Sequence, residues 1–139
     1  MKIAIINGPN LNLLGVREPE LYGYQTLESL YEQLNNLFPE IDFTFFQSNH
    51  EGELIDFIQD CHFDHFDGIV INPAAYAHTS PAIADALKGI EVPAVEVHIS
   101  NIYTRESFRH HSYTAAACKG VISGLGLKGY ELAVRHFLN

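Results

Sequence analysis

The chain has 139 residues, 47% of them hydrophobic, so it is long enough to bury a sizeable core and too apolar for a disordered segment. Its formal net charge of −9 excludes a general basic surface of the kind that binds nucleic acid or an anionic membrane. No apolar run approaches the roughly 20 residues of a membrane-spanning helix, and the opening run is too short for the core of a signal peptide.

The first predicted elements are a strand, a long loop and a helix. Residues 2–7 form a short apolar run that Gly8-Pro9 closes, as is typical of a buried strand. After a polar loop, apolar residues recur at helical spacing over residues 27–38, behind the good N-cap Thr26.

The middle of the chain continues this alternation. A Phe-rich run at residues 41–48 predicts a second strand, and residues 53–61 have the spacing of an amphipathic helix. Residues 68–72 predict a third strand. A further helix is expected to begin after Ser80, a cap that proline follows, and to stop at Gly89.

The last part of the chain completes an α/β pattern. Residues 93–100 predict a fourth strand, residues 120–123 a short fifth, and residues 129–138 a closing helix. Strands separated by helices indicate a parallel sheet covered on both faces. We predict one domain over residues 1–139, with a flavodoxin-like, doubly wound five-stranded parallel sheet in the order 2-1-3-4-5. Ligands of such sheets bind beyond the carboxyl ends of the strands, between the first and the third.

The fourth predicted strand contains an unusual polar pair. A central parallel strand should be apolar on both faces, yet this one holds Glu96 and His98. They are two residues apart, so both project to the same face and can pair, which offsets the cost of burying either alone. A carboxylate that orients an imidazole is a common arrangement for acid–base catalysis, although a purely structural pair would have the same spacing.

Two loops at the same predicted edge hold further polar residues. The long loop at residues 10–23 contains Arg17 and Tyr22 and has the length of a lid, although a plain surface connection would also fit. The turn after the third strand contains Asn72 and His78 and leads into a helix N-terminus, which favours an anion. A capping turn with a surface histidine is the alternative there.

The arginines gather at this edge. The protein has four, and three of them, Arg17, Arg105 and Arg109, lie in the loops described above or just after the fourth strand. Arginine binds carboxylates through two parallel hydrogen bonds, so an acidic protein with this distribution is expected to bind a small anion. Solvated loop charges are the alternative.

Other kinds of site are disfavoured. Cys61-His62-x-x-His65 matches no standard zinc spacing, and residues 8–10 lack the glycine pattern of a phosphate-binding loop. No G-x-S-x-G motif is present to support a serine hydrolase. Cys61 and Cys118 form no close pair and fit a reduced cytosol better than a disulfide framework. We therefore expect no metal, no cofactor and a cytoplasmic location.

Several motifs resemble the signature of the type II dehydroquinases. The first reads Asn10-Leu-Asn-Leu-Leu-Gly-x-Arg17-Glu-Pro-x-x-Tyr22-Gly23. Others follow along the chain at family-like spacing, at residues 47–56, 72–80, 95–101, 105–109 and 120–130. The resemblance implies a cofactor-free lyase with a flavodoxin-like fold that dehydrates 3-dehydroquinate to 3-dehydroshikimate by anti elimination through an enolate. It leaves open whether the role is aromatic biosynthesis or quinate breakdown.

The resemblance also implies a role for each catalytic residue. Tyr22 is the base that removes the C2 proton, and Arg17 stabilises its ionised form. His98 is the acid that protonates the departing C1 hydroxyl, and Glu96 orients it. Asn10 helps to hold the enolate oxygen through a water.

Substrate binding and assembly follow from the same resemblance. The substrate is held by a set of polar groups: Asn72, His78, Ile99, Ser100 and Arg109, with Asp85 from the helix of a neighbouring subunit. The assembly is a homododecamer, four trimers arranged tetrahedrally. Three residues near the expected trimer contact depart from the usual family pattern, namely Ala77, Pro81 and Ala84.

Two other classes of function remain as alternatives. A flavodoxin-like module could hold a small anion without turnover, but it would not need Arg17 beside Tyr22 on a loop. A metal-dependent hydrolase is the other, and metal analysis distinguishes it.

Overall fold

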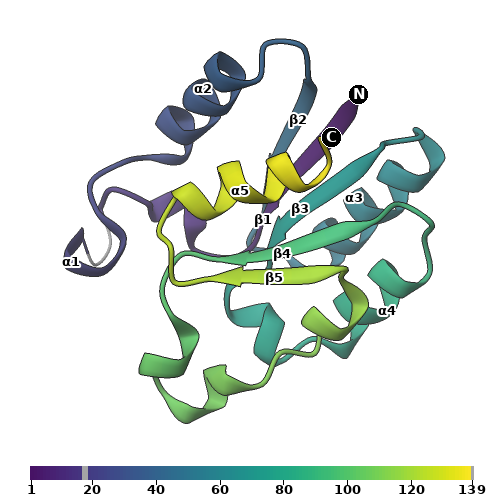
Figure 1. Ribbon diagram of the computed structural model, residues 1–139. Coiled ribbons are helices and arrows are strands. Elements are labelled where there is room, and N and C mark those ends of the chain that lie inside the picture. Colours follow the sequence, from purple (N-terminus) through teal and green to yellow (C-terminus); the bar gives the residue numbers. More distant parts are fainter. Residues whose placement is uncertain (17–18, 139) are drawn as a thin grey trace.

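The computed structural model describes residues 1–16 and 19–138, with the backbone alone at residues 21 and 22. A five-stranded sheet runs through the centre in the order β2-β1-β3-β4-β5, and all neighbouring strands are parallel (Figure 1). The strands are β1 (Lys2–Asn7), β2 (Asp42–Gln47), β3 (Gly68–Asn72), β4 (Ala94–His98) and β5 (Gly120–Ser123). The predicted sheet and its strand order are confirmed.

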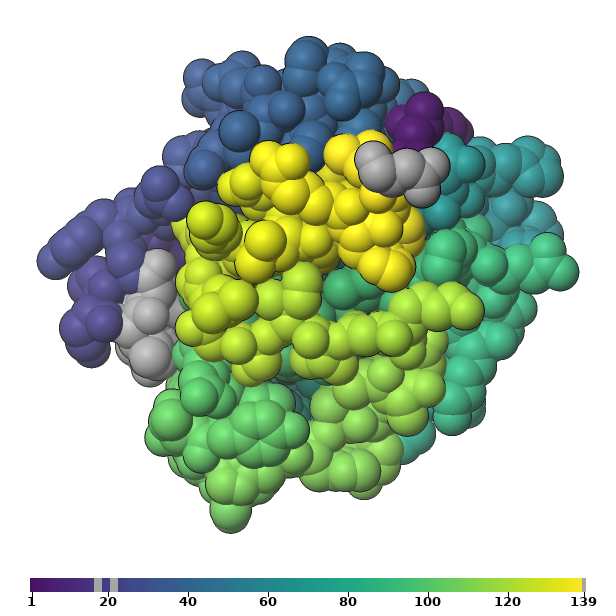
Figure 2. Space-filling model, in the orientation of Figure 1, coloured from purple at the N-terminus to yellow at the C-terminus, as the bar shows by residue number. Residues whose placement is uncertain are grey.

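Helices cover both faces of the sheet. The covering helices are α2 (Leu27–Leu37), α3 (Glu51–Phe63), α4 (Pro81–Lys88) and α5 (Lys128–His136), whereas the short α1 (Pro19–Tyr22) lies in the loop after β1. One buried cluster joins α2 and α5 to β1, β3 and β4, and a second joins α3 and α4 to the other face. Figure 2 shows α2 and α5 lying against each other over the first face. The chain therefore has the three layers that the alternation predicted.

The helix boundaries follow from local capping. Thr26 accepts a hydrogen bond from the backbone N–H of Ser29 at 3.1 Å, and Ser29 returns one to complete a capping box before α2. Ser80 accepts one from the N–H of Ile83 at 3.0 Å at the start of α4. Both caps were predicted from the sequence.

Some boundaries and short turns differ from the prediction. The helix α3 begins at Glu51 rather than at residue 53, because its first turn is polar and lies outside the apolar spacing. The short α1 lies in the predicted loop, and 3₁₀ turns fill the other connections, at Leu11–Leu13, Ala74–His78, Ile102–Thr104, Ser107–His110 and Ala115–Ala117. Such turns are too short to show a periodic pattern.

The loops after β1 and β3 approach each other closely. The N–H of Gly8 donates to the carbonyl of Asn72 at 2.8 Å, which extends the pairing of the two strands by one residue. A Cβ at Gly8 would lie 2.4 Å from the carbonyl oxygen of Pro73. Only glycine fits at this point without moving the backbone that follows β3.

We therefore expect Gly8→Ala to lower the free energy of unfolding by about 1–3 kcal/mol, because backbone atoms cannot rotate away from the added methyl group. Gly52→Ala in the first turn of α3 is the matched control, since a Cβ there meets nothing within 4 Å. The control should unfold at the same or a slightly higher urea concentration. Equal urea midpoints for Gly8→Ala and the parent would contradict the close approach.

Candidate active site

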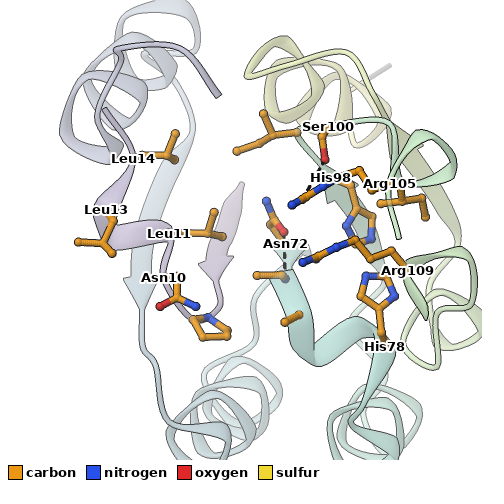
Figure 3. Close-up of a pocket in the computed structure, with 15 residues that line it drawn as sticks. Asn10, Leu11, Leu13, Leu14, Asn72, His78, His98, Ser100, Arg105 and Arg109 are labelled. Carbon is orange, nitrogen blue, oxygen red and sulfur yellow. Dashed lines mark hydrogen bonds between the residues drawn. The ribbon is translucent and has the colours of Figure 1, made fainter. Parts of the chain in front are cut away.

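A cavity opens beyond the carboxyl ends of β1, β3 and β4, at the edge where the sequence placed a ligand. In Figure 3 an apolar wall and Asn10 lie on one side, histidines and arginines lie on the other, and Asn72 lies between them. The apolar wall is formed by Leu11, Leu13 and Leu14, from the loop after β1. The polar residues that line the cavity are Asn10, Asn72, His78, His98, Ser100, Arg105 and Arg109.

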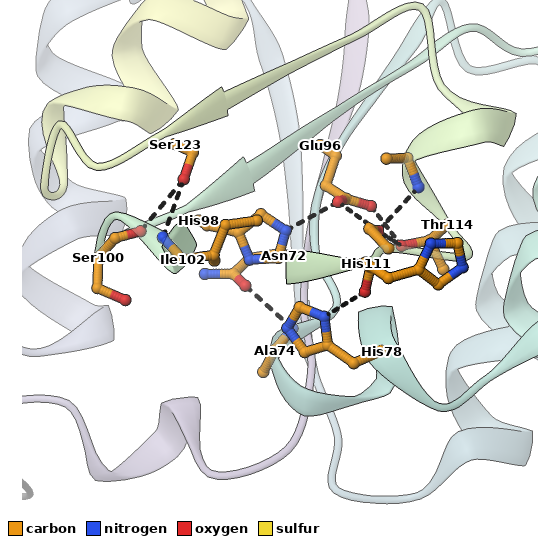
Figure 4. Close-up of polar contacts among 12 residues, drawn as sticks. Asn72, Ala74, His78, Glu96, His98, Ser100, Ile102, His111, Thr114 and Ser123 are labelled. Carbon is orange, nitrogen blue, oxygen red and sulfur yellow. Dashed lines mark hydrogen bonds and ion pairs between the residues drawn. The ribbon is translucent and has the colours of Figure 1, made fainter. Parts of the chain in front are cut away.

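The strand β4 brings Glu96 and His98 together. His98 Nε2 lies 2.8 Å from Oε2 of Glu96, and the two side chains are 6% and 0% exposed. Ser112 donates to the same carboxylate at 2.9 Å, and Thr114 makes a further hydrogen bond to it (Figure 4). A fully buried carboxylate thus receives three hydrogen bonds.

These hydrogen bonds decide the charge of the carboxylate. Burial alone would raise the pKa of Glu96, but the hydrogen bonds from His98 and Thr114 outweigh it and hold that pKa below its ordinary value. Glu96 is therefore ionised at neutral pH. An ionised carboxylate can only accept a hydrogen bond, so Glu96 keeps a hydrogen on Nε2 of His98 and fixes the orientation of the ring.

His78 lies beside His98, and its own hydrogen bond and burial decide its protonation. The two ring centroids are 5.9 Å apart, and Nδ1 of His78 lies 2.7 Å from the carbonyl oxygen of His111. A carbonyl only accepts, so this contact places the hydrogen on Nδ1. Burial lowers the pKa of His78, and the charges of His98 and Arg109 lower it further. A neutral His78 keeps Nε2 as a hydrogen-bond acceptor.

The arginines give one side of the cavity a positive charge. Arg105 Nη1 lies 3.5 Å from Oγ of Ser100, which also lines the cavity. Arg109 Nε donates to Glu106 at 3.1 Å, and this partner is 55% exposed. An exposed carboxylate is well screened by water, so it offsets little of the positive charge inside the cavity. The cavity thus suits a small anion.

Amide side chains hold the loop that contains Asn10. This residue has a left-handed backbone, with φ of 71°, and its N–H donates to Oδ1 of Asn49 at 2.9 Å. Gln47 donates to the same oxygen at 3.2 Å and to the carbonyl of Gly8 at 3.1 Å. The conformation of the loop start is therefore fixed by the segment that follows β2.

The remaining predicted site residues differ in their relation to the cavity. Arg17 and the side chain of Tyr22 lie outside the described residues. Ile99 lines the cavity, and Glu96 lies behind His98. Asp85 is exposed on α4 and does not line the cavity of its own chain.

Other parts of the site were not assigned from the sequence. Arg105 was counted among the arginines without a role, and the apolar wall was not predicted. Ser112 and Thr114, which bind Glu96, were not predicted either. The sequence offered one signal for them: a buried carboxylate such as Glu96 needs more hydrogen-bond donors than His98 alone, and these must come from elsewhere in the protein.

The described residues contain neither a metal-binding cluster nor a membrane-spanning helix. No group of three or more His, Cys, Asp or Glu side chains there is arranged to hold a metal ion. No helix in that part of the chain is both long and apolar enough to cross a membrane. Cys61 and Cys118 are free thiols.

Comparison with known proteins identifies a family. The family described as "Dehydroquinase class II" matches residues 1–138. A 3-dehydroquinate dehydratase of Clostridium perfringens is 53% identical over 141 residues, which cover 100% of this chain and 98% of that protein. One from Idiomarina loihiensis is 57% identical over 138 residues, covering 96% and 90%. The type II dehydroquinase structure from Butyrivibrio crossotus superposes with a TM-score of 0.97 at 49% identity, covering 100% of this chain and 98% of that one. The chain therefore belongs to the class II dehydroquinase family.

Proposed function

We propose that this protein is a 3-dehydroquinate dehydratase, which removes water from 3-dehydroquinate by anti elimination and gives 3-dehydroshikimate through an enolate. The observation that supports this most directly is the buried Glu96–His98 pair at the edge of a cavity lined by two arginines. The curated relatives with this name match almost the whole chain. In this proposal the reaction is the dehydration step of the shikimate pathway, and the chain forms one catalytic domain.

His98 acts as the acid in this mechanism. The C1 hydroxyl of the substrate leaves as water once it receives a proton, and His98 supplies that proton from its imidazolium form. Glu96 keeps the ring oriented, because its carboxylate is ionised and already bound to Nε2. His98 then regains its proton from solvent.

Tyr22 acts as the base and removes the C2 proton, and Arg17 stabilises its ionised form. A tyrosine with an ordinary pKa of about 10 is a poor base at neutral pH. A neighbouring guanidinium lowers that pKa by about 1–3 units, which makes the tyrosinate accessible. The loop that contains both residues runs between Gly15 and Gly23, whose positive φ values of 91° and 80° suit glycine hinges.

The other groups bind the substrate. The guanidinium of Arg109 attracts its negative charge, and His78 accepts a hydrogen bond from a ring hydroxyl through Nε2. Asn72, Ile99 and Ser100 complete the contacts, and Asn10 holds the developing enolate oxygen through a water.

We also propose that a neighbouring subunit completes the site, in a dodecamer of four trimers in the cytoplasm. The exposed position of Asp85 on α4, away from its own cavity, supports its donation to another subunit. The edge strand β5 leaves Val121 45% exposed, and Leu125 just after it is 57% exposed. A closed assembly would cover such apolar surface.

Tyr22→Phe should lower kcat by about 10²–10⁴-fold, because it removes the group that takes the C2 proton. Turnover is followed by the ultraviolet absorbance of the conjugated enone product, and circular dichroism checks the fold. Tyr24→Phe is the matched control, since Tyr24 directly follows this loop and is 81% exposed. The control should keep the parental rate.

A Tyr22→Phe rate within about tenfold of the parent would exclude Tyr22 as the base. A parent that binds the substrate without turnover would instead support an anion-binding module.

Activity should survive exhaustive chelation and need no nucleotide, because the proposed acid, base and anion-binding groups are all side chains of the protein. The test is the same absorbance assay after dialysis against EDTA, with metal analysis of the sample. Loss of activity that zinc or magnesium restores would show that a metal takes part.

The active species should be at least a trimer, and a dodecamer is expected. Light scattering coupled to size exclusion measures the mass directly. Shared sites are tested by co-expressing Asp85→Ala and Tyr22→Phe chains, each of which should be inactive alone. Mixed assemblies should regain part of the activity, because some sites receive an intact Tyr22 from one chain and an intact Asp85 from another. A fully active monomer would contradict the shared site.

A further inference from the structure

A buried chain of hydrogen bonds runs behind the cavity and ends on Asn72. Tyr130 on α5 donates its hydroxyl hydrogen to Oδ1 of Asn7 at 2.6 Å and accepts one from Nδ2 of Asn72 at 2.9 Å. Tyr130 and Asn7 are 0% exposed, and Asn72 is 3% exposed. The chain continues from Nδ2 of Asn7 to the hydroxyl of Tyr31 at 3.1 Å. Tyr130 thus links the last strand residues of β1 and β3.

The contact between Ala74 and Asn72, at one end of this series of hydrogen bonds, fixes which atom donates in each of them. The backbone N–H of Ala74 points to Oδ1 of Asn72 at 3.0 Å, and a backbone N–H can only donate. Ala74 has a positive φ of 54°, so the backbone is held in an uncommon conformation at this contact. Oδ1 of Asn72 is therefore the acceptor there, and its Nδ2 must face Tyr130.

A tyrosine hydroxyl is well suited to the next link. It accepts the hydrogen of Asn72 and has one hydrogen of its own, which it donates to Asn7. If the Asn72 amide turned over, its NH₂ group would face the N–H of Ala74, and Tyr130 could bond the amide oxygen only with the hydrogen that it now donates to Asn7. The two bonds therefore select one orientation of the amide. In that orientation Nδ2 of Asn72 gives one of its two hydrogens to Tyr130. The other hydrogen takes no part in this series of hydrogen bonds, and Asn72 lines the cavity.

We propose that Tyr130 is a positioning residue, which acts through Asn72 by fixing its amide so that Asn72 meets the substrate as a hydrogen-bond donor. The inference deepens the proposed function, since it assigns the polarity of one substrate contact. Tyr130 itself touches no substrate, because its hydroxyl is fully buried and both of its bonds go to asparagines.

The kinetic test is Tyr130→Phe, which keeps the packing of the ring and removes the hydroxyl. We expect KM to rise about tenfold while kcat changes by less than about threefold, because a contact that is made in both ground and transition states is weakened. Tyr31→Phe is the matched control: it removes the far end of the chain and leaves both bonds of Tyr130 in place. Its ring also keeps the stacking on Phe45, with centroids 4.1 Å apart. The control should keep KM within about twofold.

A double-mutant cycle separates positioning from a general loss of stability. In an Asn72→Ala background, Tyr130→Phe should change KM by less than about twofold, because the group through which it acts is gone. An equal rise of KM in both backgrounds, or a parental KM for Tyr130→Phe, would overturn the proposal.

A second readout does not depend on turnover. In the parent, the two side-chain amide protons of Asn72 should give separate, slowly exchanging NMR signals, because the amide is fixed. In Tyr130→Phe they should exchange faster with solvent, whereas Tyr31→Phe should leave them unchanged. If Asn72 keeps its parental signals in Tyr130→Phe, Tyr130 does not fix the amide, even where the dehydration itself is established. If the parent shows no dehydration but the Asn72 signals respond as expected, the proposed function fails and the positioning of Asn72 stands.

Discussion

The site depends on one buried charge, the carboxylate of Glu96 in the central strand β4. A carboxylate buried here without hydrogen-bond partners would take up a proton, because water does not reach it to solvate its charge. Its three donors come from two parts of the chain: His98 from the strand itself, and Ser112 and Thr114 from the loop beyond Arg109. The same carboxylate thus orients the ring of His98 and anchors the loop that contains the cavity's arginines.

This anchoring fixes the far end of the loop after β4, where no strand or α-helix would otherwise hold the backbone. Ser112 donates to Glu96 and accepts from the N–H of Ala115 at 3.0 Å. The N–H of Tyr113 donates to the carbonyl of Ala77 at 2.7 Å, which joins the loop to the turn that contains His78. The segments that follow β3 and β4 therefore hold each other, and the histidines on them keep their relative positions.

Parallel pairing collects the remaining groups at one edge. Asn7 and Asn72 are direct partners in the register of β1 and β3, and Ile71 is paired with Glu96 in the register of β3 and β4. Residues at the carboxyl ends of three neighbouring strands thus meet without any special loop geometry. For this reason the location of the cavity could be predicted once the strands and their order were inferred.

What the sequence could predict was decided by the range of each interaction. The Glu96–His98 contact and the two helix caps lie within three residues along the chain, and their spacing alone identifies them. The donors Ser112 and Thr114 lie 16 and 18 residues from Glu96, and Tyr130 lies 123 residues from Asn7. Serine, threonine and tyrosine are common in loops and helices, so nothing in the local pattern distinguishes these three from any other.

The protein and its proposed substrate are both negatively charged. Binding is still possible because the acidic groups lie farther from the bound anion than the arginines that line the cavity. The formal net charge is −9, yet Arg105 and Arg109 line the cavity. At physiological ionic strength the field of exposed charges decays over about 8 Å, so the acidic surface contributes little at the cavity floor. A guanidinium in direct contact with a carboxylate is not screened in this way. A small anion whose charge is confined to one group can therefore enter, whereas a long polyanion would leave most of its charges against the acidic surface. The charge distribution therefore favours a substrate with a single small carboxylate, such as 3-dehydroquinate.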